Sequence, residues 1–579
     1  MKKRSSNLLL YLLLSCIAFY LANRFTVSFQ GLEGDLLEKL NISINNFLPE
    51  LKANPLFISV SLVPLSAGLI ACAIVWLVWL YNCYDQKNYM PGIEHGSAEW
   101  GESKDIKPLM DPDPQRNIIL TATEGISLHS TKDPEYNRNK NVLVIGGAGS
   151  GKTRFYVKPN IMQMHSSYVI TDPKGEILRD CGKMLQDNGY KLKVLNLIEM
   201  DKSDFYNPFN YIKDEKDILK LVNNLITNTT SPGSKSSDEF WTKAETALLQ
   251  ALFGYVLYET LPNERNIGTV LKLLRLAEAK EEDENFKSGL DIIFEELKER
   301  TPDHFAVKQY DIFKLAAGKT AKSILVTLGV RLSPFYIEAV EHLLSDDTME
   351  LENVGEEKTA LFIIIPDSDP TFNFIAAIMY QQLFDLLFYK ADHEHDGRLP
   401  FPVRFILDEF ANIGRIPNFV TYVATMRSRE ISVNVILQNL SQLKSTYKDS
   451  WETIVGNCDS ILFLGGSEES TLEYVSKRIG KTTIDNRNIN ETKGQSASYS
   501  LNYQILGRDL ITPDEVGRMP NSECILLIRG LKPFKSQKYD IESHPNYQKI
   551  GESNKNNRFV LSGEAKSICL DNVKEVIEL

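Results

Sequence analysis

The chain has few cysteines and no pattern that would join them. None of the seven lies in a CxxC pair or at the spacing of zinc ligands. Disulfide frameworks and structural zinc sites both need such spacing, so neither is expected here. Scattered single cysteines are more typical of reduced thiols in a cytoplasm.

An excess of positive charge is also missing. The formal net charge is −12, whereas proteins that coat duplex DNA are usually basic, because phosphate contacts supply most of their affinity. This argues against a general DNA-coating role and leaves room for DNA held in a narrow basic channel. With 43% hydrophobic and 24% charged residues over 579 positions, the composition is that of a globular protein. Its length fits two or three folded units and an anchor.

Two long apolar runs are present near the N-terminus. Residues 7–23 are almost uniformly apolar and follow three basic residues, and residues 56–83 contain no charge. A helix needs about 20 apolar residues to cross a bilayer. We therefore predict two transmembrane helices, about 7–23 and 56–83, in a membrane anchor spanning residues 1–84.

The flanking charges predict how this anchor is oriented. Lys2, Lys3 and Arg4 place the N-terminus in the cytoplasm by the positive-inside rule. Two crossings then leave residues 24–55 as a short external loop and return the chain to the cytoplasm from about Tyr84. A cleaved signal peptide is the alternative for the first run, but its length and the second run nearby favour an anchor in the cell membrane.

A complete phosphate-binding motif follows a predicted buried strand at residues 141–145 and opens a predicted helix at 152–165. In such a loop, successive backbone N–H groups hold phosphates, the lysine bridges the β- and γ-phosphates, and the Thr hydroxyl binds Mg²⁺. The motif G-x-x-x-x-G-K-[ST] is matched in full, in the strand–helix context it requires. Its residues are Gly146, Gly147, Ala148, Gly149, Ser150, Gly151, Lys152 and Thr153.

An acidic pair ends a second predicted strand, residues 403–407. Asp408 is expected to hold Mg²⁺ through water, and Glu409 to orient and deprotonate the attacking water. An acid beside the Mg²⁺ aspartate favours hydrolysis of ATP over binding alone. Gln438 ends a further strand, where motor ATPases place a polar sensor of the γ-phosphate; an ordinary strand-end amide is the alternative.

Strands alternate with helical stretches, which predicts a mainly parallel α/β sheet with ligands at the carboxyl ends of its strands. The further strands expected are 167–171, 191–197, 360–365, 433–437, 461–464 and 524–528.

Apolar residues recur with helical periodicity between two of these strands, which predicts an all-α insertion at about 214–350. The fold class expected is thus α/β: a RecA-like P-loop NTPase domain, split into residues 85–213 and 351–579, with the all-α domain inserted and two transmembrane helices in front.

Several further motifs extend along the chain. The most specific is Thr171-Asp172-Pro173-Lys174-Gly175-Glu176. The others are Gly96-Ser97-Ala98-Glu99-Trp100, Tyr206-Asn207-Pro208-Phe209, Phe240-Trp241, Leu407-Asp408-Glu409-Phe410 with Gly414 and Pro417, and Arg508 with Leu510-Ile511-Thr512-Pro513-Asp514-Glu515. With these motifs the sequence resembles the VirD4/TraG family of type IV secretion coupling proteins, and the resemblance covers nearly the whole chain.

The resemblance implies a homo-hexameric ring with nucleotide sites between subunits. Arg427 falls where the family carries its trans-acting arginine finger, and Arg429 is close enough to take that role instead. The implied partners are a relaxase with single-stranded DNA and the components of a type IV secretion channel. The Asp172-Pro173-Lys174-Gly175 turn follows a strand end near the nucleotide and is expected to shape either the site or the ring lumen.

The leading functional hypothesis is a membrane-anchored ATPase that feeds a relaxase–DNA complex to a secretion channel. One alternative is a receptor for protein-only effector cargo. Another is a FtsK-like DNA translocase, which normally carries more spans, a long linker and a C-terminal DNA-reading domain.

Overall fold

The computed structural model describes residues 4–84, 90, 92–129, 133–230, 239–278, 286–316, 318–492 and 498–561. The chain divides into two compact units, residues 1–94 with 483–505, and residues 95–482 with 506–579. Each is described by itself.

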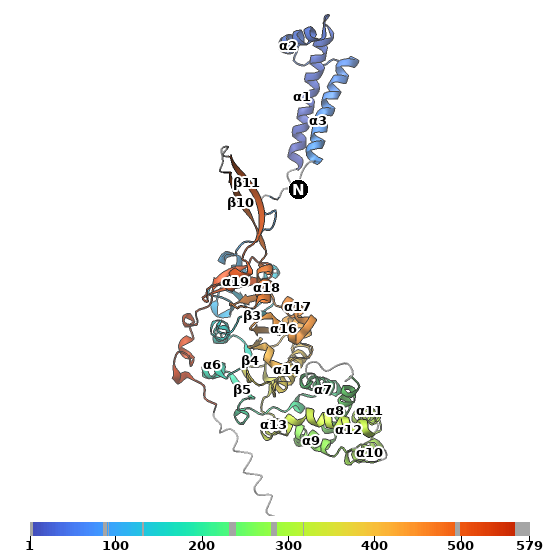
Figure 1. Cartoon of the computed structure of the whole chain (residues 1–579), viewed down its shortest axis with the longest axis vertical. Coiled ribbons are helices and arrows are strands. Elements are labelled where there is room, and N and C mark those ends of the chain that lie inside the picture. The colour runs from blue at the N-terminus through green and yellow to red at the C-terminus, as the bar shows by residue number, and fades with distance from the viewer. Residues whose placement is uncertain are drawn as a thin grey trace, which may run out of the picture. The chain divides into compact units, whose positions relative to one another are not determined.

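The first unit contains α1 (Arg4–Gln30), α2 (Leu36–Ala53) and α3 (Leu62–Tyr84). The segments Leu8–Gln30 and Leu62–Tyr81 are long and apolar enough to cross a membrane. Helices α1 and α3 pack against each other (Figure 1). The Asn23 side chain on α1 also exchanges two hydrogen bonds of 2.9 Å with the backbone of Ser59, which lies just before α3.

The first apolar helix differs from the expected 7–23, since it runs on through Arg24 to Gln30, and helix α2 occupies most of the expected loop 24–55. Arg24 does not end the helix because it is largely buried and its guanidinium donates to the Glu50 carbonyl at 2.8 Å. The apolar run in the sequence ends before this charge, but in the fold a carbonyl of the next helix, α2, accepts its hydrogen bond.

Most of a two-stranded sheet also belongs to the first unit. It consists of β10 (Lys481–Thr492) and β11 (Ser498–Asp509). The sequence did not predict this pair, because its strands are largely polar and lack the apolar run that marks a buried strand.

The second unit is built on a nine-stranded sheet in the order β13-β12-β9-β3-β8-β7-β4-β6-β5. The seven strands from β9 to β5 are parallel, and β12 and β13 continue the sheet in antiparallel fashion. All eight strands expected from the sequence are present, and β13 is an addition. The bounds are β3 (Val142–Ile145), β4 (Ser167–Asp172), β5 (Lys191–Asn196), β6 (Thr359–Ile364), β7 (Val403–Leu407), β8 (Ile431–Leu437), β9 (Ser460–Phe463), β12 (Glu523–Ile528) and β13 (Phe534–Gln537).

Both faces of this sheet are buried, as parallel sheets require. Successive side chains of a strand point to opposite faces. In β3, Leu143 and Ile145 accordingly join one hydrophobic cluster, and Val142 and Val144 join the other. The helices on the two faces include α5 (Lys158–Met162), α6 (Glu176–Asp187), α14 (Asn373–His393), α15 (Phe419–Thr425), α16 (Leu440–Tyr447), α17 (Trp451–Gly456) and α18 (Glu469–Ile479).

The segment between β5 and β6 is helical, and Figure 1 shows its helices gathered at the end of the unit away from α18 and α19 (Pro513–Gly517). Their apolar residues belong to the same cluster as one face of the sheet, so these helices extend the core of the α/β unit. They are α7 (Glu215–Thr229), α8 (Glu239–Glu259), α9 (Ile267–Arg275), α10 (Gly289–Arg300), α11 (Phe305–Lys314), α12 (Gly318–Arg331) and α13 (Glu338–Leu343).

Candidate nucleotide-binding site

A cleft of about 550 Å³ opens where four neighbouring parallel strands, β3, β8, β7 and β4, end. The phosphate-binding loop follows β3, Gln438 follows β8, Asp408 and Glu409 follow β7, and Asp172 closes β4. Because parallel strands point their carboxyl ends to one edge, residues far apart in the chain line one cleft.

The loop after β3 has the backbone that a phosphate cradle needs. Gly149 and Gly151 have φ angles of +74° and +81°, values that residues other than glycine rarely adopt. Thr153 then begins a single π-helical turn, Thr153–Val157, which leads into α5. The Lys152 ammonium lies over the loop and donates to the Gly146 carbonyl at 2.8 Å.

The structure brings Thr153, after β3, next to Asp408, after β7, the two residues that the sequence analysis expects to share a Mg²⁺ ion. The Thr153 hydroxyl donates to an Asp408 carboxylate oxygen at 3.0 Å. Burial raises the pKa of Asp408 to about 6, against the opposing effects of the Thr153 hydrogen bond and the Lys152 charge. A hydroxyl and a buried carboxylate beside a phosphate cradle are the oxygen donors that Mg²⁺ prefers, so these residues fit a magnesium ion.

Glu409 is held by a residue that the motifs did not reveal. Gln442 on α16 donates from Nε2 to the Glu409 carboxylate at 3.1 Å, and its Oε1 accepts the Gln438 backbone N–H at 2.9 Å. Glu409 itself adopts the left-handed conformation, with φ of +52°. The only signal in the sequence is a second glutamine four residues after Gln438, which is too weak to be read alone.

The Asp172-Pro173-Lys174-Gly175 turn lies in the cleft wall. The buried Asp172 carboxylate accepts the backbone N–H of Leu178 at 2.9 Å and that of Lys174 at 3.4 Å, which holds the turn closed. Burial raises the pKa of Asp172 to about 6, and the nearby Asp408 charge adds to this rise. Lys174 remains exposed over the cleft and lies 3.5 Å from Asp367.

Arg427 and Arg429 lie elsewhere, on a turn that precedes β8 and therefore at the amino edge of the sheet. The Arg429 guanidinium binds Asp392 with two hydrogen bonds of 2.7 and 2.8 Å and stacks on the Phe388 ring. Arg427 is exposed, and within the described residues its side chain forms no hydrogen bond or ion pair. The seven residues of β8 separate this turn from the cleft by about 20 Å.

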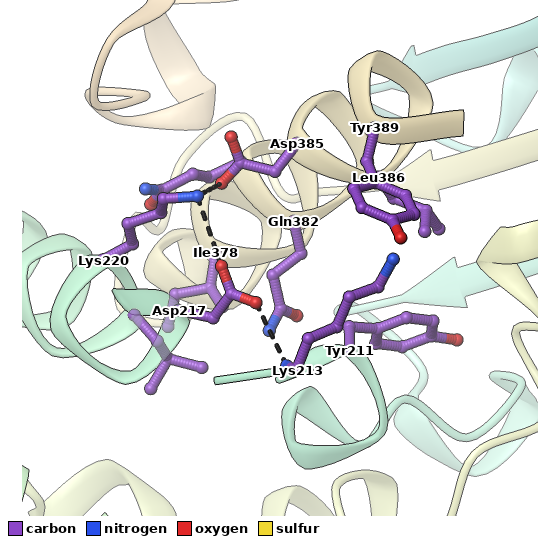
Figure 2. A pocket seen from close by; sticks show the side chains of 11 residues that line it. Tyr211, Lys213, Asp217, Lys220, Ile378, Gln382, Asp385, Leu386 and Tyr389 are labelled. Atoms are coloured by element: carbon purple, nitrogen blue, oxygen red, sulfur yellow. Dashed lines mark hydrogen bonds and ion pairs between the residues drawn. The ribbon is translucent and has the colours of Figure 1, made fainter. Parts of the chain in front are cut away.

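A second, smaller cavity of about 120 Å³ lies between α7 and α14 (Figure 2). Its charged groups already satisfy one another: Lys220 pairs with Asp217 and Asp385 at 3.2 and 3.1 Å. The Lys213 ammonium sits 3.3 Å from the centre of the Tyr389 ring. A cavity whose charges are paired in this way offers little to a ligand, so we assign it none.

The fold and the cleft together define a RecA-like P-loop NTPase that carries a helical insertion. Residues 102–554 match the family model described as "Type IV secretory system Conjugative DNA transfer". That match covers more than three quarters of the chain, and the protein belongs to this family. The expected resemblance to VirD4 and TraG is thereby confirmed.

Individual relatives agree with the family match. The conjugal transfer protein TraG of Escherichia coli is 26% identical over 513 residues, which cover 80% of this chain and 76% of that protein. Protein VirD4 of Rhizobium radiobacter is 22% identical over 425 residues, 71% of this chain and 58% of that protein.

Solved structures of the bacterial conjugative coupling protein TrwB have the same fold. An unbound form superposes with a TM-score of 0.57 at 15% identity and covers 79% of this chain and 95% of that one. Another form of TrwB, with a TM-score of 0.51 at 15% identity over 78% of this chain and 95% of that one, is a complex with ADP and Mg²⁺.

Proposed function

We propose that this protein is the coupling ATPase of a type IV secretion channel, which hydrolyses ATP to drive transfer of a relaxase bound to single-stranded DNA. Membership of the conjugative DNA transfer family supports the transfer role. The contact between Thr153 and Asp408, with Glu409 beside it, supports the ATPase role. This hydrogen bond between Thr153 and Asp408 joins the phosphate-binding loop to the acidic pair in one cleft.

The chain's own residues divide the work. The N–H groups of the loop and the Lys152 ammonium bind the phosphates, and Lys152 exchanges its Gly146 contact for a phosphate oxygen. Thr153 and Asp408 hold Mg²⁺, which when bound neutralises charge on the phosphates. Glu409 accepts the proton of the attacking water, and Gln442 keeps its carboxylate aimed into the cleft. Gln438 lines the cleft as the contact to the terminal phosphate.

The catalytic cation comes from a neighbouring subunit. Arg427 lies at the opposite edge of the sheet from its own cleft, so it reaches a nucleotide only across a subunit boundary. A ring of identical subunits, a homo-hexamer by the family resemblance, brings one subunit's amino edge to the next subunit's cleft. Arg429 already has an acidic partner and a stacked ring, which favours Arg427 as the finger.

Two substitutions test the ATPase role. Lys152→Ala removes a phosphate contact and is expected to weaken ATP binding and abolish hydrolysis. Glu409→Gln is expected to keep ATP binding and abolish hydrolysis, since it changes the base and not the cradle. Calorimetry and phosphate release on the full chain measure the two properties. Glu409→Gln protein that hydrolyses ATP at the wild-type rate removes Glu409 from its role.

The two apolar helices anchor the protein in the cell membrane, with a large cytoplasmic portion. The basic N-terminus and the two candidate spans, Leu8–Gln30 and Leu62–Tyr81, support an arrangement in which residues 31–61 face outside. A thiol introduced at exposed Asn45 should react with an impermeant reagent on intact cells, and one at exposed Lys107 should not. The reverse pattern would overturn this topology.

Single-stranded DNA is the cargo that the family match favours over a protein effector. We expect single-stranded DNA to stimulate hydrolysis by the full-length protein. Stimulation by a secreted protein substrate, with no response to DNA, favours the effector receptor instead.

A further inference from the structure

A second lysine touches the phosphate-binding loop from the far end of the chain. Lys538 follows β13, and its ammonium donates to the Ser150 carbonyl at 2.9 Å and to Asn521 Oδ1 at 3.0 Å. It also lies 5.3 Å from the centre of the Phe155 ring. The side chain is only 6% exposed, so this contact is an enclosed one.

The charge of Lys538 lacks the partner that a buried cation usually has. Among the described residues, its ammonium forms an ion pair with no carboxylate, and a carbonyl and an amide oxygen are its hydrogen-bond acceptors. Burial lowers the pKa of Lys538. A buried charge without a counter-ion is costly, and a chain of phosphates in the adjacent cradle supplies the missing negative charge.

The bond to Ser150 has a geometric consequence. A peptide group is planar and trans, so its carbonyl and the following N–H point in opposite directions. Fixing the Ser150 carbonyl therefore fixes the Gly151 N–H on the other side, and Gly151 lines the cleft. Because Gly151 has no Cβ, its backbone is less restricted than that of other residues. The Lys538 hydrogen bond to Ser150 holds the Ser150–Gly151 peptide in one orientation, with a φ of +81° at Gly151.

We propose that Lys538 is a positioning residue for phosphate binding: it locks the Ser150–Gly151 peptide so that the Gly151 N–H faces the phosphates, and its charge strengthens their binding. This inference deepens the proposed ATPase function and rests on it. Lys538 acts through the loop, and it does not itself touch the nucleotide.

The same contact links the loop to the C-terminal part of the chain. After Lys538 the chain runs along the helix that follows the loop, where Arg154 pairs with Glu542 at 3.0 Å. The buried Lys158 pairs with Glu552 at 2.9 Å and with Asp180 at 2.8 Å. Because linkage is reciprocal, phosphate binding that is favoured by the docked segment also stabilises its docking.

The test compares matched lysine substitutions in the full-length protein. Lys538→Met removes both the donor and the charge, and Lys538→Arg keeps both. Lys535→Met is the control, because Lys535 lies on β13, just before Lys538, but its side chain is 39% exposed and pairs with Glu523. Calorimetry measures the affinity for MgATP and for tripolyphosphate, a probe that lacks the base and sugar. Thermal melting without ligand reports whether each variant is folded.

We expect Lys538→Met to bind tripolyphosphate and MgATP about tenfold more weakly, the scale of a hydrogen bond to a charged group. Lys538→Arg should recover part of that loss, and Lys535→Met should stay within about twofold of wild type. Should Lys538→Met not fold, Lys538→Gln replaces it, with a shorter uncharged donor and an expected loss of at least about threefold.

Wild-type affinity in the folded Lys538→Met or Lys538→Gln protein overturns the inference, and so does an equal loss in Lys535→Met. Failure of the proposed function is a different outcome. In that case the wild-type protein itself binds neither ligand, or binds no better than Lys152→Ala.

Discussion

The carboxyl and amino ends of the strands in the nine-stranded sheet present different groups. At the carboxyl edge, β3, β8, β7 and β4 present a concave cleft with a phosphate cradle and acidic groups. At the amino edge, the turn before β8 presents the exposed Arg427, which is unpaired within the described residues. The cleft already holds Lys152, Arg154 and Lys174, and in the proposed mechanism Arg427 adds a further cation from the amino edge. In the proposed ring, two copies of the chain would complete one site between them.

The amino edge also separates two arginines that the sequence could not tell apart. Arg429 is two residues from Arg427 yet is held by Asp392, by the Thr425 carbonyl and by the Phe388 ring. A side chain with three partners gives up all of them in order to reach a neighbour, and a free one gives up none. This comparison favours Arg427 over Arg429 as the proposed arginine finger.

The largest expected effect comes from removing the exposed arginine of the amino edge while the carboxyl-edge cleft stays intact. Arg427→Ala should lower hydrolysis on the order of a thousandfold, as loss of an arginine finger does, while ATP affinity changes little. Mixing it with Lys152→Ala should restore part of the activity. In the mixture, a Lys152→Ala subunit lends its arginine to an intact cradle on its Arg427→Ala neighbour. Phosphate release by the mixed and single assemblies measures this.

Each single-variant assembly is the control, together with a separate demonstration that the two proteins assemble. If assembled mixtures stay as inactive as their parents, Arg427 does not act across the boundary. The same mixture made with Arg429→Ala then decides whether Arg429 takes that role.

A smaller effect is expected within the carboxyl edge. Gln442→Ala frees the Glu409 carboxylate from its amide donor, and we expect kcat to fall about tenfold with little change in KM, because only the aim of the base changes. Ser445→Ala on the exposed side of the same helix is the control. A variant with unchanged kcat shows that Gln442 does not position Glu409.

Low pH should weaken the Mg²⁺-dependent binding of ATP at the carboxyl edge. The carboxylate of Asp408 is the form that binds Mg²⁺, and burial raises its pKa to about 6, so this form is lost as pH falls through that value. Between pH 7.5 and 5.5 the Mg²⁺-dependent part of ATP affinity should fall about fourfold. Binding measured with EDTA present should change less. Equal losses with and without Mg²⁺ would place the titrating group elsewhere.

The smallest catalytic effect is expected at Arg429. Arg429→Ala should leave kcat within about threefold of wild type and lower the free energy of unfolding by about 1 kcal/mol, the scale of a partly exposed ion pair with a stacked ring. Denaturant unfolding and phosphate release measure the two quantities. A large loss of activity without a loss of stability reverses the assignment of the two arginines.

Much of the fold was predictable because its signals are local. The strands before Gly146 and Asp408 are fully buried and, apart from Arg404, apolar. The glycines in the motif after β3 also indicate the backbone conformation that the loop needs. The end of the first apolar helix and the β10–β11 pair were harder to predict from the sequence. Arg24 has a partner on another helix, since it donates to the Glu50 carbonyl. The sequences of β10 and β11 are largely polar and lack the apolar run that marks a buried strand.

The sequence by itself determined which residues could bind phosphate and a metal ion, since glycines, Lys152 and Asp408 sit in short patterns that the chemistry requires. Only the tertiary structure decided which residues support them. Ser150 and Lys538 are 388 residues apart, and Glu409 and Gln442 are 33 apart. It also decided that Arg427 lies across the sheet from its own cleft. The physical reason is that a strand's two ends are distant in space but close in sequence, while the ends of parallel strands meet in space whatever their separation along the chain.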